Sequence, residues 1–155
     1  MERSAALDVP QLVSGIADAC REVRAHCPFG GREATFQAML EVEARMRGYM
    51  TRRECICGIT YKGVPLGNNT SMREDLVVFT TRETVVVELK VAKKLEQRDF
   101  QQMCRYLAEC QDAHGMLVCF GDTHDEAWYV RLDGRCVLRK RVLHEEIEPT
   151  VTLTF

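Results

Sequence analysis

The sequence has no long hydrophobic run. None of its 155 residues lies in a stretch approaching the ~20 apolar residues of a membrane helix, and its start lacks the basic-then-apolar pattern of a signal peptide. It also lacks a strong charge of either sign, since 21 basic and 23 acidic residues leave a formal net charge of −2. We therefore expect an intracellular protein, cytoplasmic or nuclear, with no membrane partner and no long basic track for nucleic acid.

The cysteines lack the spacing of a zinc or iron–sulfur ligand set. Eight are present, and no two of them are separated by two residues. Cys55 and Cys57 would share one face of a strand, but no second pair or nearby histidine follows to complete a metal site. Cys104, Cys110 and Cys119 fall among apolar neighbours, where a reduced cysteine packs as a small hydrophobic residue. We therefore expect eight reduced thiols.

Helical signals come first along the chain. Asp8 is a candidate N-cap with Pro10 in the first turn, and an apolar stripe of helical period follows. The residues of that stripe are Leu12, Ile16, Ala19, Cys20 and Val23. A second helix is expected from about Arg32 to Arg47, ended by Gly48. Its expected inward residues are Phe36, Met39, Leu40 and Met46.

The rest of the chain is rich in β signals. The expected strands are 51–61, 75–79, 84–90 and 115–120, followed by a terminal hairpin that turns at Asp133–Gly134, and one helix is expected at 97–112. The length fits a single domain over residues 1–155. The order α-α-β-β-β-α-β-β-β predicts an α/β sandwich in which helices flank a central mixed β-sheet.

The central hairpin carries the most informative polar residues. Pairing the strands across residues 80–83 sets Phe79 opposite Thr84, and continuing that register sets Asp75 opposite Glu88. Facing residues of an antiparallel pair have Cβ atoms about 4.5–5.5 Å apart. Lys90 lies two residues beyond Glu88 and therefore on the same face.

Two facing carboxylates in an otherwise apolar hairpin need a compensating cation. At ~5 Å and an effective dielectric near 20 they repel by roughly 3 kcal/mol. A hard divalent ion such as Mg²⁺ or Mn²⁺ supplies the charge and prefers oxygen ligands. Lys90 can also neutralise one carboxylate, so the alternative is a cluster of Asp75, Glu88 and Lys90 at an exposed end of the sheet. The residues alone leave both open.

Three further residues can join this site. Glu33 lies in line with Phe36 on the second expected helix, where it is either a metal ligand or a first-turn glutamate favoured by the helix dipole. Gln102 and Tyr106 are spaced i, i+4, so their side chains can meet. They either orient Lys90 or a phosphate, or they form an ordinary polar flank.

Together these residues resemble a known family. Their order and spacing are similar to those of the GxxExxY proteins, a RecB-like branch of the PD-(D/E)xK nuclease superfamily with a restriction-endonuclease-like fold. Phe36 stands where that family usually has Tyr, and Arg24 where a His is common. The matching motifs are, in order, Gly30-x-x-Glu33-x-x-Phe36, Arg73-Glu74-Asp75-Leu76, Val87-Glu88-Leu89-Lys90 and Gln102-x-x-x-Tyr106.

The resemblance implies a metal-dependent nuclease that hydrolyses phosphodiester bonds, with DNA expected as its substrate rather than RNA. Asp75, Glu88, Glu33 and the carbonyl of Leu89 would hold Mg²⁺ or Mn²⁺. Lys90 would position the attacking water or the phosphate, and Gln102 with Tyr106 would orient Lys90 or the scissile strand. The basic residues that would contact the nucleic acid are Arg73, Lys93 and Lys94. A homodimer would help so small a chain to hold its substrate.

Two other functions fit parts of the sequence. The first is a non-catalytic nucleic-acid-binding or assembly module that retains the nuclease fold, which the acidic net charge favours. The second is a cysteine-based metal or redox protein, which the cysteine spacing disfavours. The basic run of the terminal hairpin is interpreted as a solvated face. Its members are Arg131, Arg135, Arg139, Lys140 and Arg141.

Overall fold

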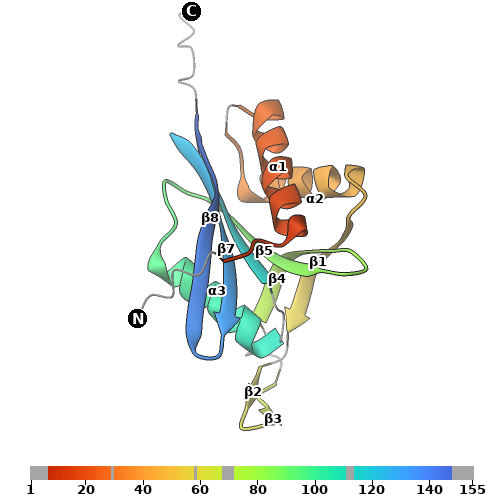
Figure 1. Cartoon of the computed structure of the whole chain (residues 1–155), viewed down its shortest axis with the longest axis vertical. Helices are drawn as coiled ribbons and strands as arrows, with labels where there is room; N and C mark the ends of the chain where they lie inside the picture. Colours follow the sequence, from red (N-terminus) through yellow and green to blue (C-terminus); the bar gives the residue numbers. More distant parts are fainter. Residues whose placement is uncertain (1–6, 29, 58, 68–71, 111–113, 148–155) are drawn as a thin grey trace, which may run out of the picture.

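The protein is a sheet with helices on both faces (Figure 1). The computed structural model describes residues 7–28, 30–57, 59–67, 72–110 and 114–147, and for 54–57, 72–75 and 110 it describes the main chain alone. Six strands form the main sheet in the order β1-β4-β5-β6-β7-β8. Only β5 and β6 pair in parallel among these strands, and the other neighbours are antiparallel. The predicted mixed sheet flanked by helices is confirmed.

The strands have the following bounds. They are β1 Met50–Cys57, β4 Met72–Phe79, β5 Thr84–Val91, β6 His114–Phe120, β7 His124–Asp133 and β8 Cys136–Glu146. A separate two-stranded hairpin, β2 Thr60–Tyr61 with β3 Val64–Pro65, turns at Lys62–Gly63 and projects from one end of the molecule (Figure 1). Both turn residues have positive φ, 49° and 80°, as a tight two-residue hairpin turn requires. The predicted strand 51–61 is therefore two strands.

The helices cover opposite faces of the sheet (Figure 1). Helices α1 Gln11–His26 and α2 Glu33–Met46 pack on one face, and α3 Gln97–Cys110 packs on the other. Because side chains alternate along a strand, β5 serves both layers: Val85 and Val87 join the α1–α2 core, and Val86 joins the α3 core. The α3 face is the side of the sheet that α3 covers.

A glycine allows α3 to lie close to the sheet. At Gly115 of β6 an added Cβ would lie 2.6 Å from the sulfur of Met103 and 3.2 Å from Leu107. Both α3 residues are fully or almost fully buried. A larger residue at this position would force the Met103 side chain to shift or push α3 away from β6.

The first two helices agree with most of the expected pattern. The five predicted apolar positions of α1 are all buried. In α2, Phe36 and Leu40 are buried as predicted, but Met46 is 77% exposed. The buried stripe of α2 continues at Ala44 instead, so its next turn falls beyond the helix end and Met46 lies off the stripe.

Helix α1 begins two residues later than predicted, and its cap comes from elsewhere in the chain. Pro10, not Asp8, occupies the N-cap position and makes no side-chain cap bond. The Leu12 N–H instead donates to Glu83 Oε2 at 3.1 Å. Glu83 lies in the connection between β4 and β5, and a carboxylate at a helix N-terminus is stabilised by the helix dipole. The cap therefore fastens α1 to the central hairpin.

The other end of α1 is fastened by Arg24. Its guanidinium makes two 2.8 Å bonds to the carboxylate of Asp125 on β7 and also donates to the carbonyl of Gly121 at 3.1 Å. Arg24 also lies over Phe36 and Phe120, which stack with centroids 4.5 Å apart. One side chain thus joins α1, α2 and the turn between β6 and β7.

No helix within the described ranges is long and apolar enough to cross a membrane.

Arg24→Met is expected to destabilise the protein strongly. Asp125 is 2% exposed, so removing the guanidinium leaves a buried charge and should lower the free energy of unfolding by about 3–5 kcal/mol. Urea denaturation measures this. Arg21→Met is the matched control, because its pairs with Glu145 and Asp18 are exposed and cost about 0–1 kcal/mol. Equal losses in the two variants would contradict the role given to Arg24.

Buried cysteines are expected to resist alkylation. Burial raises the pKa of Cys119 to about 11 and that of Cys20 to about 12, so at pH 8 both are protonated, and only the thiolate reacts. Iodoacetamide should modify Cys119 on the order of 100-fold more slowly than an ordinary thiol. Mass spectrometry of labelled peptides tests this against exposed Cys136, and equal labelling rates of the two would show that the Cys119 environment is open.

Candidate active site

The centre of the candidate site is Glu88 on β5. Glu88 follows Val86 on the α3 face, while Val87 and Leu89 point into the α1–α2 core. The Glu88 side chain is 4% exposed. The alternation of β5 therefore places a carboxylate inside the α3 layer of the protein. A buried carboxylate is retained only where a cation or hydrogen bonds stabilise it.

Lys90 supplies positive charge next to Glu88. Its Nζ lies 3.4 Å from Glu88 Oε1, and its side chain is 29% exposed. The two residues occupy successive positions on the α3 face, as their spacing predicted. The ion pair foreseen in the alternative interpretation therefore exists, but Glu88 is buried and does not lie at an exposed surface.

The predicted register of the central hairpin is confirmed over the pairs that the structure describes. These are Leu76 with Val87, Val77 with Val86, Val78 with Val85, and Phe79 with Thr84. The next pair would be Asp75 with Glu88. The main chain of Asp75 belongs to β4, but its side chain, like that of Arg73, lies outside the described part of the structure. The facing carboxylates remain a prediction.

Gln102 and Tyr106 meet on α3 as their spacing predicted. Gln102 Nε2 donates to Tyr106 Oη at 2.9 Å. Tyr106 is 4% exposed, whereas Gln102 lies at the surface. A buried hydroxyl thus holds the amide of an exposed residue in a defined orientation.

A hollow of about 350 Å³ brings several predicted residues together. Lys90 comes from β5, Lys94 from the connection after β5, and Gln102 from α3. Lys93 is exposed in the same connection, but it does not line the hollow. The hollow therefore joins a lysine beside a buried carboxylate with a second lysine and an oriented amide, a set that can bind an anion.

The start of α3 adds charged residues that were not among the predicted site residues. Glu96, Arg98 and Asp99 line the same hollow. Asp99 Oδ2 accepts the Glu96 N–H at 2.8 Å, and Arg98 Nε lies 2.8 Å from Glu96 Oε2. An acidic residue three positions after the N-cap is the available sequence signal, because it is typical of a capping box.

Glu33 lies on a helix that covers the face of the sheet opposite to the Glu88 side chain. It is the first residue of α2 and is exposed, and α2 packs on the face opposite to α3. Glu33 and Glu88 nevertheless lie toward the same end of the sheet. Phe36 of α2 stacks on Phe120, and Phe120 pairs with Val91 at the end of β5. Leu89, whose carbonyl is a predicted ligand, has its side chain buried in the α1–α2 core. The metal-binding roles of Glu33 and Leu89 remain predictions.

Part of the terminal basic run packs on aromatic rings. Arg139 lies 4.7 Å from the centroid of Phe100 and 5.3 Å from that of Trp128, and Arg141 lies 4.9 Å from that of Trp128. Phe100 and Trp128 belong to the α3 core. The arginines are exposed as predicted, but they also extend the cationic surface of the α3 face.

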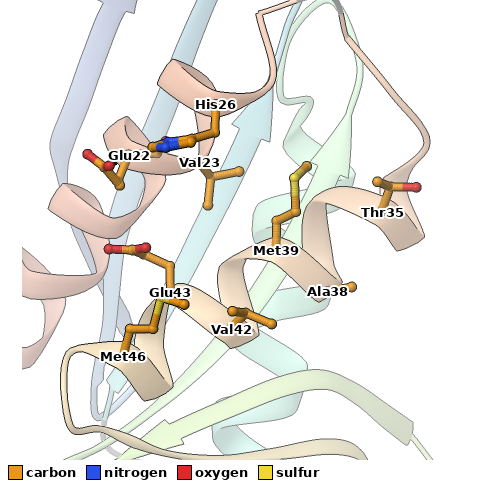
Figure 2. Close-up of a pocket in the computed structure, with 9 residues that line it drawn as sticks. All are labelled: Glu22, Val23, His26, Thr35, Ala38, Met39, Val42, Glu43 and Met46. Atoms are coloured by element: carbon orange, nitrogen blue, oxygen red, sulfur yellow. Dashed lines mark hydrogen bonds and ion pairs between the residues drawn. The ribbon is translucent and has the colours of Figure 1, made fainter.

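A second hollow, of about 400 Å³, lies between α1 and α2 (Figure 2). Figure 2 shows Met39, Val42 and Met46 along α2, with Glu22 and His26 on α1 at its margin. His26 Nδ1 lies 3.4 Å from Glu22 Oε1. None of the predicted site residues lines this hollow, so it is separate from the candidate active site.

Comparisons with solved structures give distant likenesses. The Holliday junction resolvase Hjc of Archaeoglobus fulgidus matches with 16% identity and a TM-score of 0.40, over 60% of this chain and 72% of that one. The protein SSO0001 matches with 16% identity and a TM-score of 0.38, over 84% of this chain and 65% of that one. No curated protein matches.

The family comparison is decisive. The model of the PD-(D/E)XK nuclease superfamily matches residues 10–131. The match spans both N-terminal helices, the central hairpin with Glu88 and Lys90, and α3 with Gln102 and Tyr106. The chain therefore belongs to the PD-(D/E)XK nuclease superfamily.

Proposed function

We propose that this protein is a metal-dependent nuclease that hydrolyses phosphodiester bonds, with DNA rather than RNA as its substrate. Within the superfamily we assign it to the GxxExxY family of the RecB-like branch, on the motifs set out above. The observation that carries the proposal is the buried carboxylate of Glu88, which pairs with Lys90. Lys90 in turn lines a hollow together with Gln102 and Lys94.

The donor set fits a hard divalent ion. Glu88 is a buried carboxylate, and Asp75, Glu33 and the carbonyl of Leu89 are the further oxygen donors that we propose. Oxygen ligands of this kind suit Mg²⁺ or Mn²⁺. When bound, such an ion lowers the pKa of a coordinated water and neutralises charge on the phosphate.

The protein's own residues would do the rest of the work. Lys90 Nζ, held 3.4 Å from Glu88, would donate to the attacking water or to a phosphate oxygen as negative charge develops. Gln102, oriented by Tyr106, would position Lys90 or the scissile strand. Lys94 in the hollow, together with Lys93 and Arg73, would attract the phosphate backbone.

The overall charge limits how the substrate is held. With a net charge of −2, the chain would grip nucleic acid locally, at the α3 face. We propose that a homodimer provides a second set of basic residues for the same substrate.

Cleavage of labelled single-stranded DNA, duplex DNA and RNA should require Mg²⁺ or Mn²⁺ and stop with EDTA. Glu88→Gln and Lys90→Ala should each lower kcat roughly 10²–10³-fold, because each removes a group that acts on developing charge. Lys140→Ala is the matched control: it removes an exposed lysine that pairs with Tyr129 on the face opposite to α3, and it should keep its rate. Thermal melting confirms that the variants fold.

Two results would contradict this proposal. Cleavage that survives in both Glu88→Gln and Lys90→Ala would place the chemistry elsewhere. A folded wild type that binds nucleic acid in Mg²⁺ and Mn²⁺ but cleaves none of the three substrates would instead support the non-catalytic binding module.

Gln102 and Tyr106 are expected to act together through their hydrogen bond. Tyr106→Phe removes the hydroxyl that accepts from Gln102 and should lower kcat about 2–10-fold, the worth of one hydrogen bond. Gln102→Ala should cost more, and adding Tyr106→Phe to it should cost nothing further. Single-turnover rates of the two single variants and the double variant measure this coupling, and additive losses would show that the pair has no common role.

A further inference from the structure

A second group of potential metal ligands lies at one end of the β7–β8 hairpin. Ligand atoms of His124, Glu126 and His144 all lie within 4.8 Å of one another. Glu126 and His144 are direct partners across β7 and β8, and His124 lies two residues before Glu126, so all three share one face. The two imidazole rings have centroids 5.1 Å apart.

The surroundings of the histidines match those of metal ligands. His124 Nε2 lies 3.6 Å from Glu126 Oε2, and its Nδ1 lies 3.2 Å from the hydroxyl of Thr123. His144 Nε2 lies 3.7 Å from Glu146 Oε1. A metal-bound imidazole usually makes such a contact through its second nitrogen, which fixes the ring orientation.

The chemistry of the three donors selects a class of ion. Two imidazoles and one carboxylate are the ligands of zinc and similar late transition ions, whereas Mg²⁺ prefers oxygen alone. Ligands about 2.0–2.2 Å from a tetrahedral ion lie roughly 3.3–3.5 Å apart. The ligand atoms, which lie within 4.8 Å of one another, would close by up to about 1.5 Å to reach this geometry, which is a small movement for the partly exposed rings of His124 and His144.

We propose that His124, Glu126 and His144 bind one zinc-type divalent ion, at a site separate from the one around Glu88. Lys90 pairs with Cys119, and Cys119 pairs with Glu126, so the two sites lie on the same face about 10 Å apart, two strand spacings. The ion would hold the start of β7 to the end of β8, the end of the hairpin opposite its turn. Three protein ligands leave one position for water or another oxygen donor.

Titration of the metal-free full-length chain with ZnCl₂ tests the site. Isothermal calorimetry should show one zinc per chain, and His124→Ala and His144→Ala should each weaken binding at least ~10-fold. His26→Ala is the matched control, because His26 is an exposed histidine beside a glutamate on α1, and it should leave binding unchanged. Glu88→Gln should also leave zinc binding unchanged, which separates this site from the proposed nuclease site.

Cobalt substitution identifies the ligands independently of affinity. CoCl₂ should give visible bands typical of tetrahedral nitrogen and oxygen ligation, and His144→Ala should abolish them. His144 has a side chain that is 42% exposed, so its removal should not unfold the protein. Zinc binding that is unchanged in His124→Ala and His144→Ala would overturn the proposal. Sulfur-to-cobalt charge-transfer bands would also overturn it, and they would indicate cysteine ligation.

Discussion

The arrangement of this protein depends most on the buried ion pair between Arg24 and Asp125. Both charges are largely removed from solvent, and such a pair is maintained only with good geometry and further hydrogen bonds. Here Arg24 also bonds Gly121 and stacks against Phe36 and Phe120. The pair thus fixes how α1 and α2 pack at the ends of β6 and β7. It also places Glu33, the first residue of α2, toward the end of the sheet where β5 ends.

The candidate active site follows from a second constraint, the burial of β5 on both faces. Strand β5 sends Val85, Val87 and Leu89 into one core and Val86 into the other, so the polar residues that follow Val86 must enter the α3 layer. Glu88 becomes buried there, and Lys90 meets it where the strand reaches solvent. Helix α3 can then add Gln102 and Tyr106 because Gly115 lets it approach β6 closely.

The α3 face carries two polar centres with different chemistry. Around Glu88 and Lys90 the donors are oxygens and ammonium groups, which suit a hard ion and a phosphate. Two strands away, His124, Glu126 and His144 offer a nitrogen-rich set suited to a borderline ion. Cys119 lies between them. Burial and the nearby carboxylate of Glu126 raise the pKa of its thiol, so Cys119 is uncharged at physiological pH.

Periodicity and short spacing along the chain were enough to predict several features. These are the apolar stripes of α1 and α2, the register that pairs Leu76 with Val87, the shared face of Glu88 and Lys90, and the meeting of Gln102 with Tyr106. Contacts between distant segments became visible only in the folded chain. They are the cap that Glu83 provides for α1, the pair of Arg24 with Asp125, and the grouping of His124 and Glu126 with His144. Local propensity does not identify the distant residue that a side chain will contact, because tertiary packing sets that pairing. Those contacts therefore could not be predicted.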